Sequence, residues 1–154
     1  MTDYSKVYAG PTLKGRWKLT LESGGVVKQV VEGNNVICTN GKEFLASYLY
    51  SAALAAATFT MKYVAIGSDS TAEAAANTAL GTELARQTGT VSYVSNQIFQ
   101  VTATFPSGTG TGNVYEYGLF SSSTAGTMLS RDTETLIPKG ASDSLTAVLQ
   151  ITVS

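Results

Sequence analysis

The sequence contains no histidine and a single cysteine among its 154 residues. Histidine is the most frequent general acid or base in enzymes and the commonest metal ligand, so its absence removes many hydrolytic and metal-dependent mechanisms. Cys38 has no second cysteine with which to form a disulfide bond inside the chain. It ends the apolar run Val36–Cys38, and we therefore interpret it as a small buried apolar residue.

Charged side chains are also scarce. They make up 14% of the sequence, with a formal net charge of -1, whereas soluble domains contain roughly 25% charged residues. Lysine and arginine are scattered singly, so we expect no nucleic-acid partner, because such proteins carry a basic patch. Thr, Ser, Asn, Gly and Tyr must cover the surface instead, a composition common in proteins that lie against a neighbour.

Long apolar runs are missing as well. None approaches the roughly 20 residues that a membrane-spanning helix requires, and residues 1–6 lack the apolar core of a signal peptide. We therefore expect no membrane partner, and synthesis in the cytoplasm without a Sec-type export signal. The length fits one domain, and the 44% hydrophobic content is enough for a real core.

What the sequence does contain is a clear two-residue alternation. In residues 16–21, Trp17, Leu19 and Leu21 fall on one face and polar side chains on the other, as in a half-buried strand. Further short strands are expected at residues 26–31, 36–38, 61–66, 90–94, 97–105, 114–120, 127–131 and 145–153, separated by turn residues. The expected fold is mainly β, an antiparallel β-sandwich.

One α-helix is expected at about residues 41–56, packed on this sandwich. Asn40 and Glu43 have the spacing of an N-terminal capping box, and apolar residues follow at helical spacing. The apolar stripe favours packing on a sheet over binding a partner. We divide the chain into an extended N-terminal arm, residues 1–14, and a single β-sandwich domain, residues 15–154.

The N-terminal arm shows neither helical nor strand periodicity. Its candidate anchors are Tyr4, Val7, Tyr8 and Pro11. A segment with so little packing of its own would fray unless something held it, so the arm is a candidate for docking on a neighbouring protein. The other interpretation, an additional edge strand of its own domain, is equally open at this point.

The search for catalytic groups leaves one candidate acid. Glu116 is expected to share an inward face with Val114 and Phe120. A buried glutamate needs a cationic partner or strong hydrogen bonds, and Arg86 and Arg131 are the candidate partners. We interpret these residues as a structural ion pair and not as a catalytic acid, because neither a second acid nor a cleft is evident.

Three other patterns are weaker. The glycine-rich run Gly108–Gly112 lacks the Lys-Ser/Thr ending of a phosphate-binding loop and is interpreted as a strand connection. Asp69 has no companion carboxylates at alternating spacing, so it does not predict a calcium site. The tyrosines would suit a sugar-binding platform, but core or interface packing is their more ordinary role. We expect no catalytic residue, cofactor or metal.

The final pattern is an ordered set of short segments, found at residues 39–46, 63–71, 78–86, 102–105, 112–120 and 126–131, then Lys139 and a closing strand from Asp143. This set resembles a module that is frequent in structural proteins of tailed bacteriophages. The resemblance covers about residues 36–154. Members of the group occur in tail-fibre, baseplate and other virion proteins, and small free-standing ones look like head decoration or cement proteins.

The resemblance implies a non-enzymatic component of the virion with no catalytic residues. It would assemble with copies of itself, as a trimer or other symmetric oligomer, and dock on the major capsid protein or on tail or baseplate proteins. The sequence ends at Ser154 without a fibrous extension, which favours a compact decoration, connector or adaptor subunit. The alternatives are a tail-fibre adhesin that binds host-surface carbohydrate and, more remotely, a lyase or glycosidase that uses Glu116.

Overall fold

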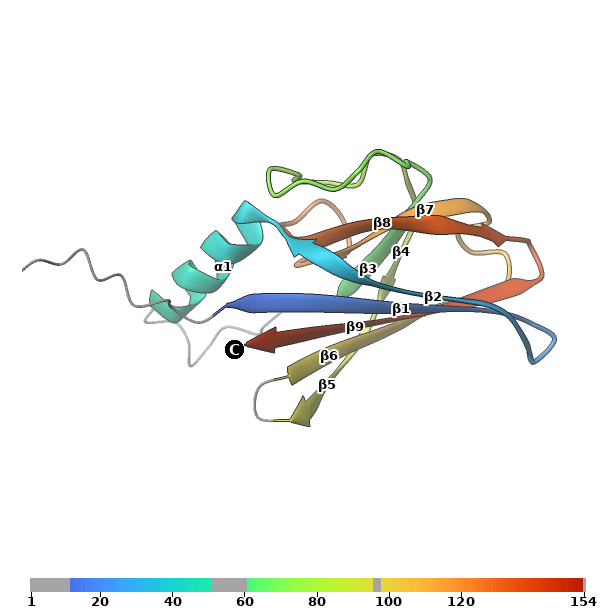
Figure 1. Ribbon diagram of the computed structural model, residues 1–154, viewed down its shortest axis with the longest axis horizontal. Coiled ribbons are helices and arrows are strands. Elements are labelled where there is room, and N and C mark those ends of the chain that lie inside the picture. The colour runs from blue at the N-terminus through green and yellow to red at the C-terminus, as the bar shows by residue number, and fades with distance from the viewer. Residues whose placement is uncertain (1–11, 51–60, 96–97, 154) are drawn as a thin grey trace, which may run out of the picture.

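The computed structural model describes residues 12–50, 61–95 and 98–153. In chain order its elements are β1 (Leu13–Ser23), β2 (Val26–Ile37), α1 (Thr39–Tyr50), β3 (Tyr63–Gly67), β4 (Glu83–Thr88), β5 (Thr90–Ser95), β6 (Ile98–Phe105), β7 (Gly112–Phe120), β8 (Met128–Lys139) and β9 (Asp143–Val153). The strands form one nine-stranded antiparallel sheet, bent into a nearly closed barrel or sandwich (Figure 1). The predicted mainly β fold with one helix is confirmed.

The strand order, β4-β3-β7-β8-β2-β1-β9-β6-β5, divides the fold into two layers. We call β2, β1, β9, β6 and β5 the first sheet and β4, β3, β7 and β8 the second sheet. β2 joins them: it pairs with β1 along most of its length, and its last residues, Val36 and Ile37, pair with β8. The prediction of a separate strand at residues 36–38 is therefore wrong, because Val36 and Ile37 continue β2 into the second sheet.

The two edges of the bent sheet meet at one point of the chain. Only Gly89 separates β4 from β5, so the backbone passes there from one edge strand to the other. The Gly89 amide donates a hydrogen bond to the carbonyl of Lys62 at 2.6 Å, and a Cβ atom on Gly89 would lie 2.6 Å from Val101 Cγ1. Glycine at this corner therefore allows the close approach that nearly closes the barrel.

The main core lies between the two sheets and is built from the predicted alternation. Trp17, Leu19 and Leu21 of β1 are at most 1% exposed. From the rest of the first sheet, β6 and β9 add Val101, Ala103, Phe105, Leu145, Ala147, Leu149 and Ile151, and the second sheet adds Ile66, Val114, Leu119 and Ile137. Each large apolar side chain buried in this way stabilises the fold by roughly 1.5–3 kcal/mol.

A second, smaller core covers the opposite face of the second sheet. It contains Cys38, Ala65, Leu80, Phe120 and Met128. Leu80 comes from residues 68–82, which the structure places outside helices and strands and which cross above β3, β7 and β8 (Figure 1). The centre of the second sheet, at β3 and the second half of β7, is thus buried on both faces, and the predicted burial of Cys38 is confirmed.

The remaining predictions concern boundaries. α1 begins at Thr39 and lies at one end of the sheets (Figure 1); its Leu45 packs against the main core. Residues 51–56 of the predicted helix lie outside the described residues. β1 begins at Leu13, so the end of the predicted arm belongs to the sheet, and β8 extends well past residue 131. In the described part of the chain, no helix is long and apolar enough to cross a membrane.

Candidate functional site

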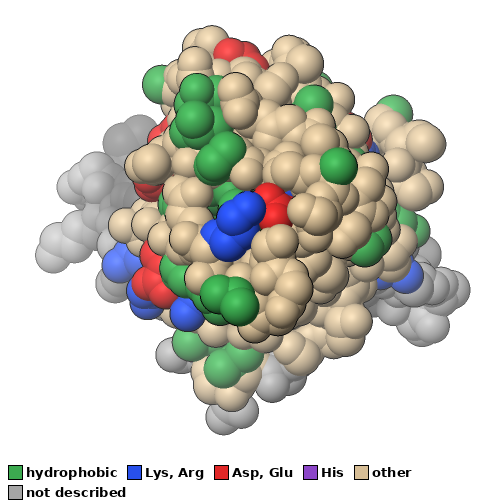
Figure 2. Space-filling view, turned by 90° about the vertical axis from the view of Figure 1, so that its right-hand side faces the viewer, with side chains coloured by type: hydrophobic (Ala, Val, Ile, Leu, Met, Phe, Trp, Pro, Cys, Tyr) green, Lys and Arg blue, Asp and Glu red, His purple; other side chains and the backbone are tan. Residues whose placement is uncertain are grey.

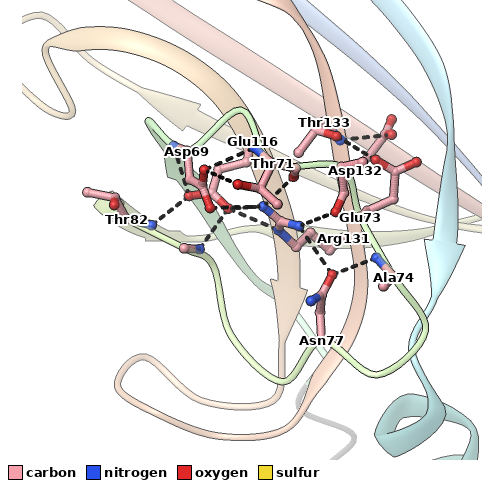
Figure 3. A network of polar contacts seen from close by, with 12 residues as sticks. Asp69, Thr71, Glu73, Ala74, Asn77, Thr82, Glu116, Arg131, Asp132 and Thr133 are labelled. Atoms are coloured by element: carbon pink, nitrogen blue, oxygen red, sulfur yellow. Dashed lines mark hydrogen bonds and ion pairs between the residues drawn. The ribbon is translucent and has the colours of Figure 1, made fainter.

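The structure brings Glu116 to Arg131 on adjacent strands of the second sheet. Arg131 Nε donates to Glu116 Oε2 at 3.0 Å, and Arg131 Nη2 lies 2.9 Å from the same oxygen (Figure 3). Glu116 is 0% exposed and Arg131 is 2% exposed. A charge-assisted pair with two donors on one carboxylate oxygen is both strong and directional, so the two side chains fix each other's position.

The direction in which Glu116 points differs from the prediction. The pairing of β7 with β8 is irregular between Val114, which lies opposite Ile137, and Glu116, which lies opposite Thr133; the extra residues at this irregularity belong to β8. The alternation of β7 between the two cores changes at the same point. Val114 therefore faces the main core, whereas Glu116 lies on the opposite face with Phe120 of the smaller core. Residues 68–82 bury Glu116 there.

The other donors of Arg131 hold these residues in place. Nη2 donates to the carbonyl of Thr71 at 3.0 Å, and Nη1 donates to Asn77 Oδ1 at 3.1 Å and to the carbonyl of Ala72 at 3.4 Å. Asn77 Oδ1 also accepts the amide of Ala74. A guanidinium has five N–H donors in a rigid fork. Here the donors of Arg131 bind the Glu116 carboxylate and acceptors in the 68–82 segment.

The acceptors of Glu116 hold the two ends of the same segment. Its Oε1 accepts the amides of Thr82 at 2.8 Å and Asp69 at 3.3 Å, and its Oε2 accepts the amide of Gly81 at 2.9 Å. A Cβ atom on Gly67 would lie 2.4 Å from Oε1, so only glycine leaves room for the carboxylate. We call Glu116, Arg131 and the backbone groups that they bind the ionic clamp.

Asp69 shapes the start of the clamped segment. Its Oδ1 accepts both the amide and the hydroxyl of Thr71, at 2.9 and 2.8 Å, an arrangement known as an Asx turn. These hydrogen bonds, the backbone one first, lower the pKa of Asp69. Within the described residues no group of three His, Cys, Asp or Glu side chains is placed to hold a metal ion. The Asp69 carboxylate thus fixes the turn that runs to Thr71.

A second group of acids lies beside the clamp. Thr133 donates its hydroxyl to Glu73, and its amide donates to Asp132 Oδ1 at 3.0 Å. Asp132 Oδ2 also accepts the hydroxyl of Tyr117 at 3.2 Å. Asp132 is 1% exposed; this burial, with the negative charges of Glu73 and Glu134, raises its pKa to about 7. The sequence did not reveal this shift, because no pattern distinguishes a buried Asp from an exposed one.

Arg86, the other candidate partner, does not bind Glu116. It pairs with Glu83 on its own strand, Nη2 to Oε2, at 2.6 Å. Its Nη1 donates to the carbonyls of Ser122 at 2.9 Å and Ala125 at 2.7 Å. The guanidinium carbon lies 3.7 Å from the centre of the Phe120 ring, a cation–π contact. Arg86 thus fastens the turn after β7 to edge strand β4.

A buried lysine was also missed by the sequence analysis. Lys139 is 1% exposed, and its Nζ donates to the carbonyls of Asp143 at 2.7 Å and Pro106 at 3.1 Å. The Asp143 carboxylate accepts Lys28 Nζ at 3.0 Å and the amide of Gly140 at 2.8 Å. Lys28 and Gly140, in that order, lower the pKa of Asp143. These contacts tie together the turns at the end of the sandwich opposite α1.

A hollow of about 170 Å³ lies on the outer face of the first sheet, apart from these buried groups. It is lined by Arg16, Lys18, Glu32, Val148 and Gln150, with Trp17. Typical ligand sites measure roughly 300–1,000 Å³. In this hollow Glu32 pairs with Arg16 at 2.7 Å and with Lys18 at 3.4 Å. The geometry fits an ion-paired surface better than a substrate pocket.

The surface supports this view. Figure 2 shows the end of the molecule opposite α1, where charged side chains form a few small groups on a mostly uncharged polar surface. Among the described residues, the large apolar side chains that are exposed are all valines: Val26, Val27, Val30, Val91 and Val94. None is aromatic, although Tyr63, Phe99 and Tyr115 are partly exposed. The predicted docking residues Tyr4, Val7, Tyr8 and Pro11 lie outside the described residues.

Comparison of the chain with protein-family models, with curated proteins and with solved structures found no match.

Proposed function

We propose that this protein is a non-enzymatic structural subunit of a tailed-bacteriophage particle, made in the host cytoplasm and carried in the virion. It works by association: copies assemble into a trimer or other symmetric oligomer and dock on the major capsid protein or on tail or baseplate proteins. A compact decoration, connector or adaptor subunit fits the size of the folded domain. Neither a cofactor nor a nucleic-acid partner is part of this proposal.

The ionic clamp is the observation that carries the proposal. The resemblance to the phage module rests on separate segments of the chain, and the clamp joins four of them: Asp69 comes from 63–71, Gly81 and Thr82 from 78–86, Glu116 from 112–120 and Arg131 from 126–131. The ordered segments therefore belong to one folding unit. Such a unit is what a module reused in many virion proteins requires.

The use of charge supports the non-enzymatic part of the proposal. Glu116 was the one candidate acid, and its two oxygens accept hydrogen bonds from Arg131 and from three backbone amides. A general acid must reach a substrate atom within hydrogen-bond distance. Glu116 is 0% exposed, so a substrate cannot reach its carboxylate, and its hydrogen bonds stabilise the fold.

The proposal is tested on gradient-purified particles of the phage that encodes this chain. Quantitative mass spectrometry should find the protein in fixed proportion to the major capsid protein after a high-salt wash. A ratio near that of the capsid protein would indicate head decoration, and a small fraction of it would indicate a tail or baseplate position. Absence from washed particles would contradict the proposal and return attention to carbohydrate binding.

A further inference from the structure

Strand β5 is the most exposed regular element of the described chain. It is the last strand in the sheet order and pairs with β6 on one side. Its described side chains, Thr90, Val91, Ser92, Val94 and Ser95, are all exposed. Val91 and Val94 are 42% and 52% exposed. Among the described residues, these side chains on both faces of the strand are exposed and no strand pairs with its outer edge, although it carries apolar side chains.

An open edge strand presents unpaired backbone N–H and C=O groups, which are a template for another strand. Proteins usually protect such an edge with charged side chains, proline or a covering segment. The opposite edge, β4, carries Glu83 and Arg86, which form an ion pair. β5 contains neither charge nor proline: the sequence has no charged residue between Arg86 and Glu116 and no proline between Pro11 and Pro106.

The same absence of charge identifies a suitable partner. When two identical strands pair side by side about a two-fold axis, any charge on the strand comes close to its own copy and repels it. β5 carries no charge and therefore avoids this repulsion. The residues of β6 beside it, Gln100 and Thr102, are also uncharged; they pair with Ser92 and Thr90. Antiparallel pairing about a two-fold axis is also closed, so it ends at a dimer.

We propose that β5 is a self-association edge, at which β5 of one copy pairs antiparallel with β5 of a second copy. The first sheets of the two copies then become one continuous sheet, and the contact covers Val91 and Val94. This inference deepens the proposed function, because it specifies one of the contacts by which copies of the subunit associate.

The first test adds charge to the edge in the full-length chain. Val91→Lys and Val94→Lys bring like charges from both copies into the proposed contact, and Val26→Lys and Val30→Lys add the same charge at exposed sites on β2, which lies on the other side of the first sheet. We expect light scattering to show that the β5 variants weaken self-association by at least about tenfold, whereas the β2 variants associate like the unmodified chain. All four positions are exposed, so the melting temperatures should be nearly unchanged.

The second test measures proximity directly. Ser92 lies near the middle of β5, so the two copies of residue 92 should lie close to the two-fold axis. Antiparallel neighbours have Cα atoms about 4.5–5.5 Å apart, a distance that a disulfide bond spans. Ser92→Cys should therefore form a cross-linked dimer under mild oxidation, and the control Val30→Cys should not. The native Cys38 is fully buried and does not compete.

The outcomes separate this inference from the proposed function. If the unmodified chain associates and the β5 lysine variants associate equally well, the self-association edge is wrong, while the structural subunit stands. If the unmodified chain is a monomer at every concentration and Ser92→Cys does not cross-link, the edge is again wrong. The amount of protein in washed particles then decides separately whether the subunit belongs to the virion.

Discussion

The two sheets of this fold use their side chains in opposite ways. The centre of the second sheet is buried on both faces, and its charged residues Glu116 and Arg131 bind the 68–82 segment that covers it. The first sheet has one open face and ends at the open edge strand β5. The two sheets therefore differ in the role of charge. Charged side chains in the second sheet stabilise the fold, whereas the uncharged edge of the first sheet is suited to contact with another copy.

The largest effect is expected from breaking the ionic clamp. Arg131→Met removes the cation and leaves Glu116 buried without a partner, a change that costs about 3–5 kcal/mol. Folded domains have a free energy of unfolding of roughly 5–15 kcal/mol, so this variant should be close to unfolding. Urea denaturation followed by circular dichroism measures the loss.

The double variant Glu116→Gln with Arg131→Met provides the control for this experiment. It removes both charges, so its loss should be smaller than the sum of the losses of the two single variants, because paired groups are energetically coupled. Additive losses would mean that the two residues do not act as a pair.

A smaller effect, dependent on pH, is expected from Asp132. Its pKa is raised to about 7 in the folded protein, against 3.8 for the free side chain. The folded state therefore holds this proton more tightly, and the group lowers stability as pH rises from about 4 to about 7. Asp132→Asn keeps an acceptor for Tyr117 and should raise stability at pH 8 by on the order of a few kcal/mol, with little change near pH 4.

The measurement is the unfolding midpoint of both proteins as a function of pH. Asp69 and Asp143 have lowered pKa values, so they stabilise the fold above their unfolded pKa and lose this contribution as pH falls. The two opposing trends predict maximum stability of the unmodified chain in mildly acidic solution. Parallel pH profiles for the two proteins would mean that the pKa of Asp132 is the same in the folded and unfolded states, and would contradict this prediction.

Arg86 should contribute less than the clamp. Arg86→Met loses the hydrogen bonds to Ser122 and Ala125 and the charge above Phe120, and we expect a loss of roughly 1–3 kcal/mol. Arg86→Lys keeps the charge without the planar fork and should recover only part of the loss. Hydrogen exchange of the turn after β7 reports whether Arg86 fastens it. Unchanged exchange in Arg86→Met would contradict that role.

The smallest effect is expected on the open face of the first sheet. Arg16 and Glu32 are paired at 2.7 Å, but their side chains are 63% and 40% exposed. Solvent screens such pairs, and their contribution is small. Glu32→Gln should leave the melting temperature unchanged within error. A large decrease would mean that charge supports the fold in the first sheet as it does in the second.

Much of the first sheet could be predicted from the sequence. Alternation in β1, β6 and β9 is regular because one face meets the core and the other meets water. The second sheet was harder to predict. β4 combines charged and apolar residues without regular alternation, and its position depends on closure at Gly89.

The ionic clamp was predictable in part. A glutamate within an apolar strand predicted a buried ion pair, but the choice between Arg86 and Arg131 depends on which strand lies beside β7. The direction of Glu116 depends on the irregular pairing of β7 with β8 between Val114 and Glu116. Neither is a local property of the sequence. The raised pKa of Asp132 likewise results from residues brought together only by the fold.

The most direct test of self-association is the mass of the unmodified full-length chain in solution, measured by sedimentation equilibrium over a wide concentration range. Self-association through β5 predicts that the average mass rises with concentration from one chain toward a defined small multiple. It also predicts that this rise is reduced in Val94→Lys and retained in Val26→Lys. A mass of one chain at every concentration would contradict the claim that the protein works by associating with copies of itself.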